Sequence, residues 1–150
     1  MHALDVDWDH PTDPRPGPQL DHVRAYVTSA GADGHLWHGV PTLLLTTVSR
    51  ATGRTVRTPL IYGEDRDAAR LIVLASAFGA PDHPAWYGNL TAHPETRVQV
   101  GATTFKATAR TGTPTERDTY WDMMTGLWPP YEDDQVSARP REIPLVILQR

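Results

Sequence analysis

Cysteine is absent from this chain of 150 residues, and the chain has no long apolar run. The lack of cysteine excludes disulfides, a cysteine nucleophile, cysteine-ligated zinc and thiol redox chemistry. Any redox function would therefore need a bound cofactor to carry the electrons. No stretch approaches the roughly 20 apolar residues of a membrane-spanning helix, and the N-terminus lacks the basic start and apolar core of a secretory signal. We therefore expect a cytoplasmic protein, and we leave open a peripheral association with a membrane.

An excess of basic residues is also lacking, since the formal net charge is −4 and the pI is about 5.9. A nucleic-acid-binding domain usually presents a basic face, so nucleic acid is not expected as a partner, although local arginines could still bind an anion. What the chain does have is 39% apolar residues, with five tryptophans and five tyrosines. This length and composition suit a single domain with one core.

Familiar catalytic motifs are missing as well. The sequence contains no nucleophile elbow, no P-loop and no glycine-rich dinucleotide-binding motif. His35 and His38 are three residues apart but have no third candidate ligand nearby in the sequence, and a metal site needs more than such a pair. Hydrolysis, nicotinamide binding in a Rossmann site and metal binding are therefore not expected.

The order of apolar runs and turn signals predicts a mainly β protein with flanking helices, of the α+β class. Residues 1–18 contain four prolines among several acidic residues, which predicts a flexible or extended arm, and residues 19–150 then form the folded domain. Helical spacing predicts a helix over 19–30 that ends at Gly31. Apolar and β-branched segments predict strands over 42–48, 56–63, 70–76, 96–110 (bent or split near Gly101) and 143–148.

Two further helices are predicted between these strands. Asp82 is placed to cap a short helix over 82–92, with Pro84 in its first turn. Another helix starts near 113–116 and ends at about Gly126. Because the connections between strands are short, the strands should pair antiparallel, and a closed or half-closed barrel with helices packed outside is the expected architecture.

Residues 41–59 predict a β-hairpin whose turn is rich in hydrogen-bond donors. The turn carries Arg50, Thr52, Gly53, Arg54 and Arg57. Arginine matches phosphate with two donors, and glycine lets free backbone N–H groups approach an anion. The turn is therefore a candidate phosphate-binding site, and the alternative is an exposed hairpin turn without a ligand.

Aromatic residues cluster in two later segments. Residues 83–89, HPAWYGN, follow a small-residue bend at 76–80. Small residues let a flat ligand approach the backbone, and a helix N-terminus attracts anions. The alternative is that Trp86 and Tyr87 pack in the core, and His83 is either a proton donor or a neutral packed histidine. Residues 128–135, WPPYEDDQ, are expected to form a lid over a pocket or a seal at the barrel end.

Five stretches resemble the deazaflavin-dependent nitroreductase family. They are LLLTTVSRATG, RTPLIYG, LASAFGAPDHPAWYGNL, WPPYEDDQ and REIPLVIL, in the family's order and spacing over roughly residues 19–148. Members of that family are small split-β-barrel, FMN-binding-like oxidoreductases that use the reduced coenzyme F-420, an 8-hydroxy-5-deazaflavin. The resemblance implies a reductase that transfers a hydride from this coenzyme to a small, planar, electron-poor acceptor such as a quinone, a nitroaromatic or an enone.

The same resemblance implies which residues form the site. Trp128, Tyr131 and Ile61 would face the substrate. On chemical grounds the proton would come from solvent or from a nearby hydroxyl, for which Tyr131 and Ser76 are the candidates and so the candidate catalytic residues. No metal is implied. The coenzyme's phosphate-bearing tail and ring would contact residues from the hairpin, the third strand, the helix after it and the late aromatic segment: Arg50, Ala51, Thr52, Val56, Arg57, Thr58, Pro59, Leu60, Ile61, Leu74, Ala75, Ser76, Ala77, Ala85, Trp86, Tyr87, Gly88, Asn89 and Tyr131.

Some positions depart from the family's pattern. Basic residues are common where this chain has Ala51, Val56 and Ala77, and a tyrosine is frequent where Asp134 stands. Arg54 and Arg57 are candidates to replace the missing charges. Two alternatives therefore stay open: an FMN- or haem-binding relative with the same barrel, and a non-catalytic coenzyme-binding protein. A monomer and a homodimer are both compatible with the sequence.

Overall fold

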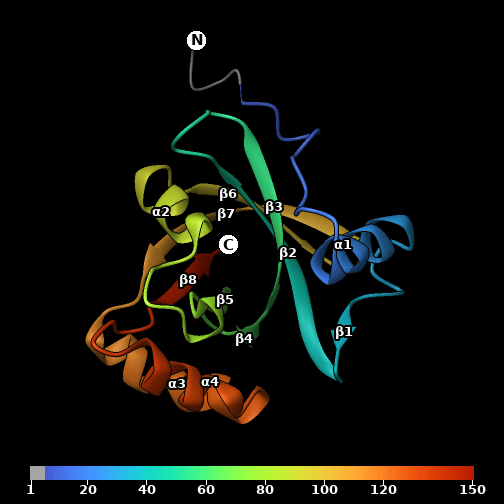
Figure 1. Ribbon diagram of the computed structural model, residues 1–150. Helices are drawn as coiled ribbons and strands as arrows, with labels where there is room; N and C mark the ends of the chain where they lie inside the picture. Colours follow the sequence, from blue (N-terminus) through green and yellow to red (C-terminus); the bar gives the residue numbers. More distant parts are fainter. Residues whose placement is uncertain (1–5) are drawn as a thin grey trace.

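A curled antiparallel sheet with helices around it makes up the computed structural model, which describes residues 6–150. The described residues form one eight-stranded sheet in the order β1-β2-β6-β7-β8-β5-β4, and β3 pairs with the other edge of β2 (Figure 1). The strands are β1 (Leu36–Trp37), β2 (Val40–Val48), β3 (Thr55–Ile61), β4 (Gly63–Asp65), β5 (Arg70–Leu74), β6 (Glu95–Val100), β7 (Thr103–Thr111) and β8 (Leu145–Gln149).

The sheet curls because the chain changes its strand partner at Tyr62. β3 pairs with β2 from Ile61 back to Thr55, and two residues after Ile61 the short strand β4 begins to pair with β5. The Tyr62 N–H donates to the carbonyl of Pro41 at 3.2 Å and keeps the crossover point against β2. The strand predicted over 56–63 is therefore two strands, and the half-barrel that results confirms the predicted split-barrel fold class.

Alternate residues of β5 point to two different cores. Leu71 and Val73 pack inside the barrel, whereas Ile72 and Leu74 pack against helices α3 (Pro114–Leu127) and α4 (Pro130–Ala138). This alternation follows from the two-residue repeat of a strand. Because both faces are covered, β5 is a rigid support for whatever lies beyond its end at Leu74.

The predicted helix over 19–30 is α1 (Pro18–Thr28), which lays Val23 and Tyr26 on β2 beside Leu44. The Tyr26 hydroxyl donates to the carbonyl of Thr42 at 3.1 Å and accepts from the N–H of Gly101 at 2.7 Å. The strand predicted over 96–110 splits at Gly101 as expected, since a φ of +60° suits glycine in the tight turn between β6 and β7.

The other helices differ in part from the prediction. Helix α2 spans Ala85–Ala92 with Pro84 at its N-cap, so the prediction that Asp82 caps this helix is wrong. The physical reason is that a residue before proline disfavours helical backbone angles, which keeps His83 out of the helix. Helix α3 begins with a capping box in which Thr113 and Glu116 bond reciprocally. Helix α4, over residues expected to form a lid or seal, was not predicted as a helix.

The described part of the N-terminal arm is extended and lies against β3. Thr12 forms a parallel bridge with Val56, donating its N–H to the Thr55 carbonyl at 2.8 Å and accepting from the Arg57 N–H at 2.9 Å. The prediction for residues 1–5 lies outside the described residues, and the division into an arm and a domain stays a prediction. Within residues 6–150, no helix combines the length and the apolar character needed to cross a membrane.

Candidate functional site

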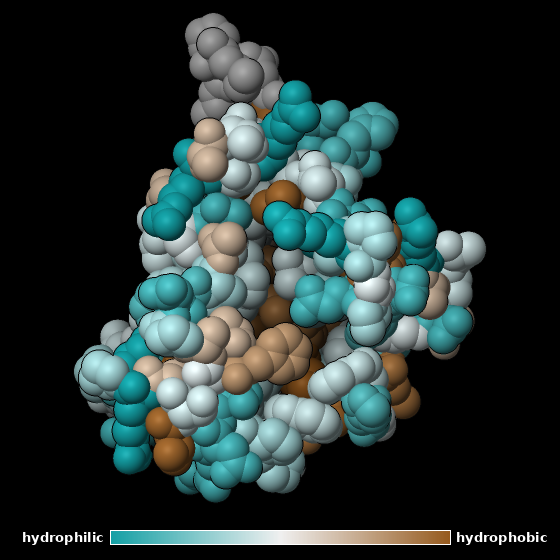
Figure 2. Space-filling view, viewed as in Figure 1, coloured by the Kyte–Doolittle hydropathy of each residue, from teal (hydrophilic) through white to brown (hydrophobic). Residues whose placement is uncertain are grey.

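A cleft of about 1170 Å³ opens between the arm, β3, the start of α2 and α4. Figure 2 shows apolar atoms at the bottom of a hollow near the centre of this face, with hydrophilic atoms around it. The structure brings most of the sequence-predicted site residues to this cleft: Arg50, Ala51, Val56, Arg57, Thr58, Pro59, Leu60, Ile61, Leu74, Ser76, Ala77, Ala85, Trp86, Asn89, Trp128 and Tyr131.

The hairpin tip presents side chains to the cleft, but its backbone donors already have partners. The N–H groups of Ala51 and Thr52 both point to the Ser49 hydroxyl at 3.3 Å. The Gly53 N–H donates to the Ser49 carbonyl at 2.8 Å, and the Arg54 N–H to the Thr52 hydroxyl at 3.2 Å. The expectation of free backbone N–H groups in this turn is therefore wrong, since the turn satisfies them internally. Anion binding here would depend on Arg50.

Asn89 and Gly88 of α2 fix the position of Arg50. The Arg50 N–H donates to Asn89 Oδ1 at 3.2 Å, and Asn89 Nδ2 donates to the Thr47 hydroxyl at 3.2 Å. The Arg50 guanidinium lies over Gly88, with Cζ 2.8 Å from the position that a Cβ would occupy there. Asn89 therefore ties the hairpin to α2, and Gly88 leaves the space in which the guanidinium rests.

Arg57, which was expected to bind the coenzyme tail, is engaged by the arm. Its Nε donates to Asp13 Oδ1 at 2.7 Å and its Nη2 to Asp13 Oδ2 at 2.9 Å, and both side chains are about three-quarters buried or more. Such a bidentate pair is stronger than a single charged contact. Arg57 lines the cleft, but its charge is largely neutralised by Asp13.

The loop after β5 forms another wall and has an unusual backbone. Ala77 and Phe78 both lie in the left-handed region, with φ of 48° and 54°, and Gly79 follows with φ of 79°. Each such non-glycine residue costs roughly 1–2 kcal/mol. Arg141 offsets this cost by donating to the carbonyls of Ala75, Ser76 and Ala80 at 2.8–3.0 Å. Backbone in this state tends to occur at functional sites.

Aromatic residues gather at the end of the cleft away from Arg50. The rings of Trp37 and Trp128 lie 4.9 Å apart, and Tyr131 is buried beside Leu74 and Ile61 in the same cluster. Burial raises the pKa of the Tyr131 hydroxyl well above its usual value, and the charge of Asp134 adds to this effect. Burial also raises the pKa of Asp134, with Asp133 contributing. This end of the cleft suits a flat, uncharged molecule.

Comparison with known proteins decides between the possible ligands of this cleft. A family model described as F420H(2)-dependent quinone reductase matches residues 20–150. The chain belongs to the F420H(2)-dependent quinone reductase family. Membership confirms the resemblance stated from the sequence, and with it the prediction of a reductase whose cofactor is coenzyme F-420.

Individual members of the F420H(2)-dependent quinone reductase family and related structures are similar over most of the chain. The putative F420H(2)-dependent quinone reductase Rv3178 of Mycobacterium tuberculosis is 36% identical over 110 residues, which are 73% of this chain and 90% of that protein. The structure of an F420-H2 dependent reductase (FDR-A) matches with a TM-score of 0.66 and 33% identity, covering 73% of this chain and 94% of that chain. A structure described as a domain-swapped dimer matches with a TM-score of 0.69 and 30% identity, covering 86% and 92%.

The residues of the cleft fit the cofactor of the quinone reductase family. The Arg50 guanidinium makes no ion pair within residues 6–150, so it is available to an anionic tail. The small residues Ser76 and Ala77 line the cleft together with the apolar residues Pro59 and Leu60, which suits a flat ring system. The roles of the individual site residues stay predictions.

Four predicted site residues do not line the cleft. Ala75 is fully buried in the barrel core, and Tyr87 packs beside it with its hydroxyl on Thr111 at 2.6 Å. Thr52 lies on the hairpin tip outside the cleft, and Gly88 is covered by Arg50. His83 also lies outside, where burial and the charge of Arg141 lower its pKa. Arg141 donates to His83 Nδ1 at 3.1 Å, which favours a neutral imidazole, although the residue is exposed and not packed in the core.

Sequence reasoning missed the part of the wall that comes from distant segments. No local signal reveals that the arm pairs with β3, since this contact joins residues more than forty positions apart. Trp37 could have been found as an aromatic residue next to His38 in the short segment between Gly34 and Gly39. The missed residues are those at 12–19 together with His22, Trp37, Thr42, Ser49, Phe78, Pro84 and Asp134.

Proposed function

We propose that this chain transfers a hydride from reduced coenzyme F-420 to a quinone held at the aromatic end of the cleft. One observation carries the proposal: a single continuous cleft joins the guanidinium of Arg50 to the paired indoles of Trp37 and Trp128. A ligand with an anionic tail and a flat ring could therefore bind with its tail at the hairpin and its ring near the tryptophans.

Bound in its reduced form, coenzyme F-420 supplies the hydride from its deazaflavin ring. Arg50 would hold the tail by charge-assisted hydrogen bonds, and Pro59, Leu60 and Ala77 would hold the ring in the apolar middle of the cleft. Trp128 and Ile61 would hold the acceptor parallel to the ring, with the reacting atoms roughly 3–3.5 Å apart. The barrel wall beneath them is packed and rigid, which favours such positioning.

The reaction also needs one proton, because a quinone takes up a hydride and a proton to become a hydroquinone. Tyr131 and Ser76 remain the proposed donors within this cleft. The raised pKa of Tyr131 keeps its hydroxyl protonated, so it can donate a hydrogen bond to a carbonyl oxygen of the acceptor. The same raised pKa makes Tyr131 a weak acid, and water that enters the open cleft would supply the net proton.

Other properties of this chain are proposals that the geometry of the cleft does not carry. Nitroaromatics and enones are electron-poor and planar like quinones, and we propose them as further acceptors. A domain-swapped dimer is the printed description of one similar structure, and for this chain both a monomer and a homodimer stay proposals. The cytoplasmic location also stays a prediction.

The test is a titration followed by a single turnover. We expect the protein to quench or shift the fluorescence of coenzyme F-420 on binding, and Arg50→Ala to raise the dissociation constant about tenfold, as for one charged contact. Arg54→Ala is the matched control, because Arg54 lies on the same turn outside the cleft. Reduced coenzyme should then be oxidised when menadione is added.

The outcomes separate the alternatives. Binding of the coenzyme without turnover over a panel of quinones, nitroaromatics and enones would favour the non-catalytic binding protein. Tight binding of FMN in place of coenzyme F-420 would favour the FMN-binding alternative. An equal effect of Arg50→Ala and Arg54→Ala would contradict the role given to Arg50.

A further inference from the structure

The N-terminal arm is one wall of the cleft. Every residue from 12 to 19 lines the cleft, opposite the loop after β5 and the start of α2. Figure 1 shows the arm passing beside β3 before it enters α1. Since the bridge between Thr12 and Val56 is parallel, the arm continues in the direction of β3, alongside the segment proposed to hold the coenzyme.

Several contacts hold the arm in this place. Thr12 makes two backbone hydrogen bonds to β3, and the carboxylate of Asp13 pairs with both Nε and Nη2 of Arg57. Upstream, the Thr55 hydroxyl donates to the Asp7 carbonyl at 2.6 Å, and the Arg97 guanidinium lies 4.2 Å from the ring centre of Trp8. Prolines at 11, 14, 16 and 18 restrict the arm further, because each one fixes its own φ.

The arm also changes the charge of the cleft. The charged side chains that line it are Asp13, Arg15, Arg50, Arg57 and Asp134. Asp13 neutralises Arg57, whereas Arg15 and Arg50 form no ion pair within residues 6–150. Arg15 is exposed to the cleft and makes no hydrogen bond through its side chain to another described residue. The arm therefore contributes one of the two cationic side chains that the cleft can offer to an anion.

We propose that Arg15 is a coenzyme-binding residue and that Asp13 is the positioning residue that holds it at the cleft. This inference rests on the proposed function, since it assigns Arg15 to an anionic group of coenzyme F-420. A role for Arg15 would compensate for the uncharged residues Ala51, Val56 and Ala77, which also line the cleft. The arm, which pairs with β3 at Val56, adds the charge of the Arg15 guanidinium to the cleft.

The first test compares two exposed arginines. Arg15→Ala should raise the dissociation constant of coenzyme F-420 about tenfold, as expected for one charged contact, and should leave the melting temperature of the ligand-free protein unchanged. Arg24→Ala is the matched control, because Arg24 is exposed on α1 outside the cleft. An unchanged dissociation constant for Arg15→Ala would overturn the inference, as would an effect confined to the KM of menadione. The wild type and Arg50→Ala are titrated in the same experiment. If the wild type does not bind coenzyme F-420, the proposed function fails, and this result is distinct from a failure of the inference about Arg15.

The second test asks whether Asp13 acts through Arg15. Asp13→Asn should weaken binding severalfold, and adding Arg15→Ala to it should cost less than Arg15→Ala costs in the wild type, since coupled residues are not additive. Asp9→Asn, an exposed carboxylate on the same arm, is the control and should bind as the wild type does. Tighter binding by Asp13→Asn would mean that Asp13 competes with the coenzyme for Arg57, and additive effects would mean that Asp13 does not position Arg15. Either result overturns the inference.

Discussion

Gly88 has no side chain, and the Arg50 guanidinium occupies the space where one would be. Its Cζ lies 2.8 Å and its Nη1 2.9 Å from an ideal Cβ on Gly88, which is closer than real Cβ atoms come to such neighbours. The backbone of Gly88 is helical, so the need for glycine is one of space and not of backbone conformation. At the scale of single residues, a missing methyl group decides where the principal cation of the cleft lies.

Gly88→Ala should therefore weaken coenzyme binding while it strengthens the helix. Alanine favours a helix over glycine by about 1 kcal/mol, but its Cβ would push the guanidinium out of its place, and we expect a rise in dissociation constant of about tenfold for the lost charged contact. Gly126→Ala in α3 is the matched control, because nothing lies within 4 Å of a Cβ there. Fluorescence titration with coenzyme F-420 measures the dissociation constants of the two variants. Equal affinities for the two variants would show that Arg50 binds nothing from this position.

The sequence predicts some of these residue roles and not others. Arg50 could be predicted because a turn between two apolar strands places its side chain at a hairpin tip. Arg57 and Asn89 could not be assigned in this way, because each is engaged by a residue far away in the chain, Asp13 in one case and the hairpin backbone in the other. A local pattern identifies a residue that can bind an anion, but only the fold shows whether that residue is already occupied.

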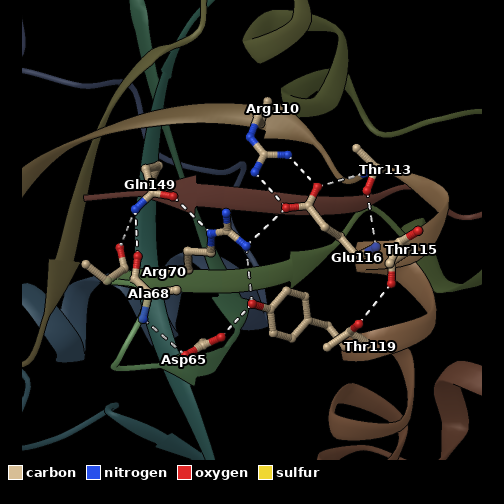
Figure 3. Close-up of polar contacts among 11 residues, drawn as sticks. Asp65, Ala68, Arg70, Arg110, Thr113, Thr115, Glu116, Thr119 and Gln149 are labelled. Carbon is tan, nitrogen blue, oxygen red and sulfur yellow. Dashed lines mark hydrogen bonds and ion pairs between the residues drawn. The ribbon is translucent and has the colours of Figure 1, made fainter.

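The Glu116 carboxylate is one of the groups that attach helix α3 to the barrel, as Figure 3 shows, and the Tyr120 hydroxyl, which donates to Asp65 of β4 at 2.6 Å, is another. Glu116 accepts from Arg110 of β7 at 2.6 and 2.7 Å and pairs with Arg70 of β5 at 3.1 Å, while it also caps the helix through the Thr113 N–H. These contacts, led by the hydrogen bond from Arg110, lower the pKa of Glu116 to about 2. One side chain thus joins the helix to two strands, and α3 in turn supports α4 and the aromatic end of the cleft.

Glu116→Gln should lower the stability of the protein at neutral pH and lose this effect in acid. The folded state holds the pKa of Glu116 below its unfolded value of about 4.5, so the carboxylate stabilises the fold above that pH, and this stabilisation disappears as the pH falls towards 2. We expect a deficit of about 1.5–3 kcal/mol at pH 7, the range for hydrogen bonds to charged groups. Urea unfolding of the variant and the wild type at several pH values measures this difference in the free energy of unfolding.

Glu142→Gln is the control for that experiment. Glu142 is highly exposed and lies 3.8 Å from Arg117, and an exposed pair contributes little. The free energy of unfolding of the Glu142→Gln variant should match that of the wild type at each pH. A deficit in Glu116→Gln that stays constant down to pH 3 would show that the carboxylate's charge is not what holds α3.

At the scale of elements, periodicity predicts the long segments well. The strands over 42–48 and 70–76, the split at Gly101 and the helix that Thr113 caps are found close to their predicted places. The errors arise where tertiary contacts decide. The chain changes partner at Tyr62 because the sheet closes on itself, and α4 forms because it packs on the strained loop at Gly79, where backbone atoms of Asp134 lie 2.9–3.0 Å from the point that a Cβ on Gly79 would occupy. Neither contact leaves a periodic signal in the sequence.

The whole molecule is needed to build the cleft. Its walls come from residues 12–22, 37–42, 49–61, 74–89 and 128–134, which are brought together only by the curled sheet. The unfolded chain separates these segments, so it cannot bind the coenzyme as the folded protein does. The net charge of −4 also indicates that the anion site depends on folding. In an acidic protein, an anion binds where the fold brings arginines together.

Coenzyme F-420 should therefore raise the melting temperature of the whole protein. A ligand that binds only the folded state at about 100 times its dissociation constant stabilises it by about 2.7 kcal/mol, which corresponds to roughly 5–10 °C for a chain of this size. FMN at the same concentration should produce no shift, and Gly88→Ala should show a smaller shift because its weaker binding removes about 1.4 kcal/mol for each tenfold loss. A rise in melting temperature with FMN and none with coenzyme F-420 would show that this barrel binds the flavin and not the deazaflavin. Because five separate segments must assemble to bind the tail and the ring, the shift reports the entire fold and not the stability of one loop.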